Sequence, residues 1–208
     1  MKKLSFLSLC IVYMLLSGSF SSCASKIEDK NPPVYVWPKG PKYYYSFNEK
    51  IFLFEVDNKI VLSFDEKYLS DIQQYLEGKP QIQNTEFHIE NHYCILTTVE
   101  NTDVKALMKD LKKQTTGVKS VNPMYTIAGG LEMGVTDLIV VQFKKNVTQQ
   151  EIDKIQEKYH AEVKEINQLF LLLSVPIDFD PLEVANAIQE SGLTNYSNPN
   201  FIAKKEYW

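Results

Sequence analysis

The amino-acid sequence predicts an α+β fold in which an aromatic β-hairpin precedes two tandem βαββαβ units. Three observations lead to this prediction. The chain has 208 residues, of which 44% are hydrophobic and 12% aromatic, enough for one large or two small packed cores. Short β-branched and aromatic runs alternate with segments whose apolar residues recur every three or four positions. The same order of these elements occurs twice along the chain.

The first 42 residues are predicted to be an export signal and a tether. Residues 1–22 combine two lysines with an apolar run that is too short to span a membrane, which is typical of a signal peptide. The small residues just before Cys23 resemble the lipobox of bacterial lipoproteins, in which the thiol is acylated. Residues 23–42 are polar and then rich in proline. We therefore expect an exported protein that is lipid-anchored in the bacterial cell envelope, at the outer membrane or cell surface; ordinary secretion is the alternative.

An aromatic hairpin is predicted where the folded part begins. The runs 43–47 and 51–54 are rich in tyrosine and phenylalanine and flank a polar turn at 48–50. We expect this hairpin to pack on the first unit, with which it forms a domain over residues 43–127. A platform on which sugars stack is the alternative for its tyrosines.

The first unit is predicted from the spacing of apolar residues after the hairpin. Its two helical segments have apolar residues three and four positions apart, and Asp103 is placed to cap the second helix. The predicted elements are strand 60–64, helix 68–76, strands 82–89 and 93–99, helix 104–111 and strand 118–125.

The second unit, residues 137–208, is predicted to repeat this order after a flexible, glycine-containing linker at 128–136. Thr148 and Glu151 have the spacing of a capping box, and Asp180 followed by proline is typical of a helix start. The predicted elements are strand 138–143, a helix that follows the capping box and has Ile152, Ile155 and Tyr159 on one face, strands 161–166 and 170–175, a helix that starts at 180–183 and is stopped by Gly192, and a strand that ends near 201.

Matching landmarks in the two units lie 76 to 79 positions apart, which indicates an internal duplication. The order βαββαβ is that of ferredoxin-like folds, in which two helices cover one face of an antiparallel sheet and the other face is free. We expect the function to reside on this free face. The landmark pairs are Phe64 and Phe143, Tyr93 and Phe170, Asp103 and Asp180, and Pro123 and Pro199.

The sequence offers few groups for catalysis. The formal net charge is -4 and all 22 basic residues are lysine, so we expect no nucleic-acid partner. Cys94 is predicted to be a buried core thiol, with a reactive thiol near His88 as the alternative. His88 and His92 are expected in a hairpin, too far apart to share a metal ion, and His160 at a helix end. The sequence predicts no enzyme, metal or cofactor; an enzyme would need these histidines to meet carboxylates in one pocket.

The second unit resembles the propeptides of secreted subtilisin-type proteases, and is similar in particular to fervidolysin-like N-terminal prodomains. The likeness covers the second unit closely and residues 60–125 more faintly. The segments that carry it are 138–144, 147–148, 159–161, 170–176, 185–188, 191–193 and 196–201, ending in Asn198-Pro199-Asn200-Phe201.

The resemblance implies a ferredoxin-like domain that guides the folding of a protease and then inhibits it. In such complexes the open sheet face docks on the enzyme and an extended tail lies in the substrate cleft. No protease domain follows in this sequence, so we expect a free-standing inhibitor or chaperone of a subtilisin-type serine protease, with Trp208 in the first pocket. For the tail, the alternative is that its aromatic residues pack back on the second unit. For the chain, the alternative is a non-inhibitory structural or ligand-binding surface lipoprotein. The tail residues are Lys204, Lys205, Glu206, Tyr207 and Trp208.

Overall fold

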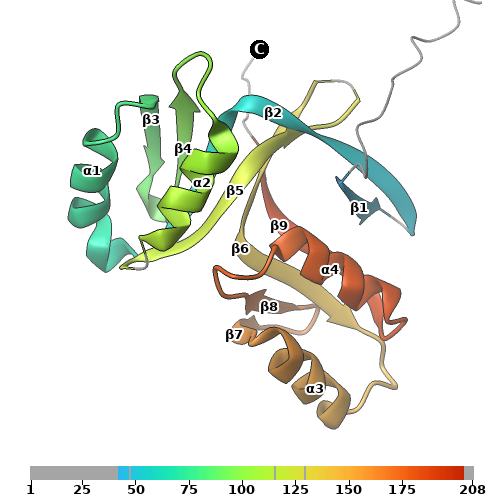
Figure 1. The fold of residues 1–208 in the computed structure, drawn as a ribbon. Helices are drawn as coiled ribbons and strands as arrows, with labels where there is room; N and C mark the ends of the chain where they lie inside the picture. Colours follow the sequence, from blue (N-terminus) through green and yellow to red (C-terminus); the bar gives the residue numbers. More distant parts are fainter. Residues whose placement is uncertain (1–41, 47, 115, 129, 204–208) are drawn as a thin grey trace, which may run out of the picture. The chain divides into compact units, whose positions relative to one another are not determined.

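β-branched and aromatic runs make up much of the chain, and they assemble into a curled antiparallel sheet of nine strands within a mixed α/β fold. The computed structural model describes residues 42–46, 48–114, 116–128 and 130–203 (Figure 1). In these ranges no helix is long and apolar enough to cross a membrane. The strands are β1 (Lys42–Ser46), β2 (Glu49–Phe64), β3 (Ile82–His88), β4 (Tyr93–Thr98), β5 (Val118–Thr126), β6 (Glu132–Phe143), β7 (Glu162–Ile166), β8 (Leu171–Ser174) and β9 (Thr194–Ala203), and the helices are η1 (Glu66–Tyr68), α1 (Leu69–Glu77), η2 (Ile89–Asn91), α2 (Val104–Lys113), α3 (Gln149–Tyr159) and α4 (Pro181–Glu190).

The sheet is continuous between the two halves of the chain. Its strands follow in the order β3-β4-β2-β5-β6-β8-β7, with β1 also paired to β2 and β9 also paired to β6. All of these pairs are antiparallel. Strands β2 to β5 with α1 and α2 form the first half, and β6 to β9 with α3 and α4 form the second (Figure 1). The predicted mixture of helices with antiparallel strands is confirmed.

The core of the first half lies between its strands and its two helices. The apolar spacing of three and four places one side of each helix against the sheet, as the sequence predicts. Asp103 caps α2, where its side chain accepts a hydrogen bond from the backbone N–H of Ala106 at 3.0 Å. The buried residues of this core are Ile60, Leu62, Phe64, Ile72, Leu76, Cys94, Leu96, Leu107, Leu111, Val118 and Val121.

The core of the second half is built in the same way, and both predicted helix starts are confirmed. Thr148 and Glu151 form the capping box at the start of α3. Asp180 caps α4 by accepting a hydrogen bond from the N–H of Leu182 at 2.9 Å, with Pro181 in the first turn. The buried residues of this core are Ile139, Val141, Ile155, Ala161, Leu173, Val175, Val184, Ala185 and Ile188.

The two halves share strand order and pairing register. In each half the first strand lies between the third and the fourth, and the second strand lies outside the third. Ile60 pairs with Pro123 in the first half, and Ile139 pairs with Pro199 in the second. The register is irregular just before both isoleucines, and again four residues later in both halves. Val61–Asn122 and Val140–Asn198 are the next equivalent pairs.

The predicted linker at 128–136 is wrong in its second part. β6 begins at Glu132, and Gly134 pairs with Met124 of β5, so these residues belong to the sheet. Gly134 serves close approach rather than flexibility. A Cβ there would lie 2.5 Å from Val61 Cγ2 and 2.6 Å from Ile202 Cγ1.

The prediction of a free sheet face is wrong for the first half, whereas the face of the second half is open in part. On the face of the first half that points away from the helices, Val61 is buried together with Met124, and Ile202 of β9 packs against them. In the second half, Val140 stands at the position equivalent to Val61 and is only half-buried. Tyr196, two residues before Asn198, is 43% exposed. The end of β9 thus covers the face of the first half, and the face of the second half has no such cover among the described residues.

Gly134→Ala should lower the free energy of unfolding by about 1–3 kcal/mol, because the added methyl group overpacks the contact between β6, β2 and β9. The midpoint of urea unfolding, followed by circular dichroism, measures this loss. Gly78→Ala is the matched control, since a Cβ there meets only carbonyl oxygens at 3.6 Å or more. Equal midpoints for the two variants would contradict the close approach.

Candidate binding groove

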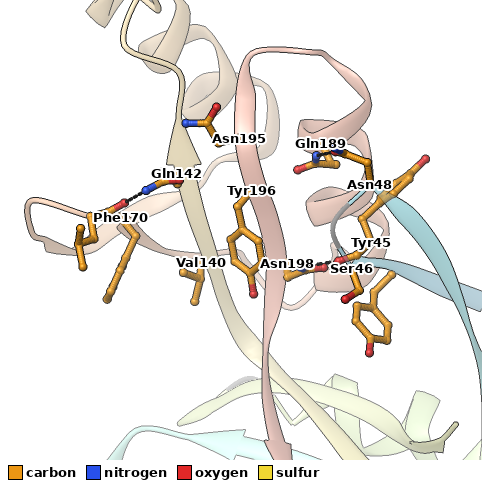
Figure 2. A pocket seen from close by; sticks show the side chains of 12 residues that line it. Tyr45, Ser46, Asn48, Val140, Gln142, Phe170, Gln189, Asn195, Tyr196 and Asn198 are labelled. Carbon is orange, nitrogen blue, oxygen red and sulfur yellow. Dashed lines mark hydrogen bonds between the residues drawn. The ribbon is translucent and has the colours of Figure 1, made fainter. Parts of the chain in front are cut away.

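The candidate site is an open groove in the second half, over the sheet face that points away from α3 and α4 (Figure 2). Side chains alternate along β6, so every second residue packs toward the helices while Val140 and Gln142 point the other way. Their partners on β9 are Asn198 and Tyr196, respectively. These four side chains form the floor of the groove.

The loop between β7 and β8 forms one wall. Asn167 orders this loop, because its Oδ1 accepts hydrogen bonds from the backbone N–H groups of Leu169 at 2.8 Å and Phe170 at 2.9 Å. Gln142 ties the loop to the floor by donating from Nε2 to the carbonyl oxygen of Leu169 at 2.9 Å. Leu169 is 69% exposed, and Figure 2 shows Phe170 on the same side of the sheet as Val140.

The aromatic hairpin forms the opposite wall. Its expected packing on the first unit holds for β2, where Phe54 pairs with Thr126 and Leu53 packs with Tyr125, but is wrong for β1. β1 pairs with β2, but its other edge is held by the second half. Asn186 of α4 donates from Nδ2 to the carbonyl oxygen of Tyr43, and Asn198 of β9 donates to that of Tyr45, both at 2.7 Å. Side-chain amides therefore substitute for a neighbouring strand along β1.

Charged groups also fix the hairpin to α4. The hydroxyl groups of Tyr43 and Tyr45 donate to Glu190 Oε1 at 2.8 and 2.7 Å, and Lys50 Nζ lies 3.7 Å from the same oxygen. The hydrogen bond from Tyr45, followed by that from Tyr43, holds the pKa of Glu190 below its ordinary value of 4.5. The ionised form of Glu190 is thus the one that binds the hairpin.

The groove has a volume of about 610 Å³ and its chemistry is uniform. Amide and aromatic side chains dominate, and none of the described residues that line it is charged. Asn198 is 3% exposed, and its Oδ1 has no hydrogen-bond partner within the described ranges. The described lining consists of Tyr44, Tyr45, Ser46, Asn48, Val140, Gln142, Leu169, Phe170, Gln189, Asn195, Tyr196 and Asn198.

A second cavity, of about 510 Å³, lies beside the buried carboxylate of Asp137. Ser63 donates to Asp137 Oδ1 at 2.9 Å and Ser174 donates to Oδ2 at 2.7 Å. The hydroxyl groups of Ser63 and Ser120 are 2.6 Å apart. Both carboxylate oxygens therefore serve a polar joint between the two halves, which explains the burial of this charge without a catalytic role.

The structure bears on only some of the residues singled out in the sequence. Cys23 and residues 204–208 lie outside the described ranges, as do residues 1–41. Cys94 is completely buried in the first core, and this burial raises the pKa of its thiol to about 12. The prediction of a core thiol is confirmed, since the reactive form would be a thiolate.

The three histidines lie at the ends of elements. His88 ends β3 and stacks on Tyr93 with ring centroids 4.6 Å apart, whereas His92 follows η2. The predicted hairpin between them is confirmed, as is the place of His160 at the end of α3. Across the part of the chain that the structure describes, no three His, Cys, Asp or Glu residues gather where they could hold a metal ion.

Comparison with known proteins gives no relative: no protein-family model, no curated protein and no solved structure matches this chain. The groove was not anticipated from the sequence, because its walls come from segments far apart in the chain. Two local signals pointed toward it. They are the tyrosine run of β1 and the outward-facing Asn195-Tyr196 pair on β9.

Tyr45→Phe should raise the pKa of Glu190, because it removes the strongest of the interactions that favour the carboxylate. Since the folded pKa lies below the ordinary one, this contact stabilises the fold above about pH 4.5 and is lost as the pH falls through the folded value. An NMR titration of the side-chain carboxyl carbon measures the change. Tyr159→Phe, on α3, is the control; an equal Glu190 pKa in both variants would contradict the contact.

Proposed function

We propose that this chain binds and inhibits, or chaperones, a subtilisin-type serine protease at the bacterial cell envelope. The observation that carries the proposal is the course of β9. This strand pairs with β6 as far as Ala203 and leads directly to residues 204–208, the segment that the resemblance to protease propeptides assigns to the substrate cleft. Residues 204–208 would bind there as an added strand, with Trp208 in the first specificity pocket.

The proposal includes two ferredoxin-like units that arose by duplication. The shared strand order and the matching pairs Ile60–Pro123 and Ile139–Pro199 support it. Irregularities of register at equivalent places are further support, because they depend on backbone detail that unrelated halves have no reason to share.

The second half is the one proposed to dock on the protease. The face of the first half is filled by Ile202 and its neighbours, whereas the face of the second half is open. Leu169 and Tyr196 give that face exposed apolar area, which an interface requires at its centre. The chain needs no reactive group for this role, since a tail held by a docked domain blocks the cleft by occupying it.

Replacing residues 204–208 by a Gly-Ser segment of equal length should raise the inhibition constant for subtilisin by at least about tenfold, because tail contacts are lost while the docking face remains. Hydrolysis of a chromogenic peptide measures inhibition, and an unchanged thermal transition shows that the fold is retained. Leu131→Ser, a change at an exposed residue between β5 and β6, is the control and should inhibit normally. Equal inhibition by the tail variant, or none by the natural chain, would refute the proposal.

The proposed anchor is an acyl group on the Cys23 thiol, after removal of residues 1–22. Cys23→Ser should abolish incorporation of an alkynyl fatty acid in a bacterial host and move the protein from the membrane fraction to the soluble fraction. Cys94→Ala is the control and should keep the label, because its thiol is buried in the core. A labelled, membrane-bound Cys23→Ser protein would contradict the anchor.

A further inference from the structure

We propose that the groove of the second half binds a neutral oligosaccharide, which stacks on Tyr196 and forms hydrogen bonds with the amide side chains around it. This inference does not rest on protease inhibition, since it follows from the lining of the groove alone. The volume of about 610 Å³ is in the range of sites for small ligands.

The absence of charge in the described lining selects a neutral ligand. Charged residues make up 23% of the chain, but the twelve described lining residues include none of them. A phosphate, carboxylate or ammonium group bound there would lose water without gaining an opposite charge. A sugar with hydroxyl groups only has no such penalty.

The polar groups of the groove can form hydrogen bonds with the hydroxyl groups of a sugar. Asn198 is more than nine-tenths buried and its Oδ1 has no partner within the described ranges. In the same ranges, no hydrogen bond engages the amide of Asn195 or the hydroxyl of Tyr196, both of which are exposed. Amides and hydroxyl groups both donate and accept, as do the hydroxyl groups of a sugar. Asn195 and Tyr196 can therefore each pair with one ligand hydroxyl in either direction, whereas the Nδ2 of Asn198 is already engaged with Tyr45.

Apolar surface lies next to these polar groups. Tyr196 is 43% exposed and Leu169 is 69% exposed, and Val140 and Phe170 also line the groove (Figure 2). A pyranose ring presents C–H groups on its faces and hydroxyl groups at its rim. Stacking on an aromatic ring buries the faces while the rim reaches the amides.

An extended peptide fits the groove less well than a sugar does. Peptides that add to a sheet pair with the backbone groups of an edge strand. The floor here is the face of β6 and β9, whose backbone groups already pair with each other from Ile139 to Phe143. The side chains of the floor offer no regular row of donors and acceptors in place of an edge.

The sugar and the proposed protease would compete, because both use the open face around Tyr196. Among the described residues, no groove lies at the equivalent place in the first half. In the first half, Gly134 and Ile202 occupy the space above Val61 that is open above Val140.

Isothermal titration of the full chain in mild detergent with neutral hexasaccharides tests the proposal. The probes are cellohexaose, laminarihexaose, maltohexaose, mannohexaose and xylohexaose, with hexagalacturonate and an uncharged decapeptide as rival ligands. At least one neutral hexasaccharide should bind saturably with a Kd below about 1 mM, and more tightly than either rival. Because this assay contains no protease, its outcome is separate from that of the inhibition experiment.

Two variants locate the binding site. Tyr196→Ala should raise the Kd of the hexasaccharide that binds by at least about tenfold. Asn195→Ala, which changes only an exposed side chain, should raise this Kd by about threefold or more. Val99→Ala is the matched control, since Val99 is also 43% exposed but lies outside the groove, and should bind normally. Binding of none of the five neutral probes, tighter binding of a rival, or natural affinity in both groove variants would overturn the proposal.

Discussion

The close approach of β6 and β9 to β2 at Gly134 is the constraint on which the rest of the fold depends. It brings Ile202 onto Val61 and allows β6 to pair with β5. A side chain at this point would press against Val61 and Ile202 and weaken the contact between the two halves. The same contact covers the second face of the first half, and so determines which of two similar faces stays open.

The two halves illustrate how one backbone pattern serves two surfaces. At equivalent cross-strand positions the first half has Ser63 opposite Ser120, and the second has Gln142 opposite Tyr196. The serines are small enough for the buried joint with Asp137, whereas the larger pair is accessible in the groove. The difference in side-chain size follows the difference in burial, since both serines are buried and Tyr196 is 43% exposed.

The sequence predicted what local patterns determine. The helix caps at Asp103, Thr148 and Asp180 could be recognised because each depends on residues within one turn. The linker was placed wrongly because glycine in a strand and glycine in a loop give the same local signal, and only contact with Val61 distinguishes them. These contacts join residues many positions apart.

The packing of β1 on the second half and the groove escaped prediction for the same reason. Asn186 and Tyr43 are 143 positions apart, and no periodicity in the sequence relates them. The tyrosine run predicted a hairpin correctly, but its packing partner is decided by amides on α4 and β9. Likewise, a free sheet face was expected in both halves. The sequence of the first half gives no sign that Ile202 of β9, which belongs to the second half, covers its face.

Side-chain amides have two distinct roles around the groove, and this division argues that the site is preorganised. Gln142 holds the β7–β8 loop, and Gln189 donates to Asn48 Oδ1 at 3.3 Å, so each wall is fixed by an amide already engaged. Asn198 holds Tyr45 through its Nδ2, whereas the exposed side chains of Asn195 and Tyr196 have no hydrogen-bond partner within the described ranges. A ligand that used the unpaired groups would therefore not need to break the bonds that shape the groove, and little of its binding free energy would be lost to rearrangement.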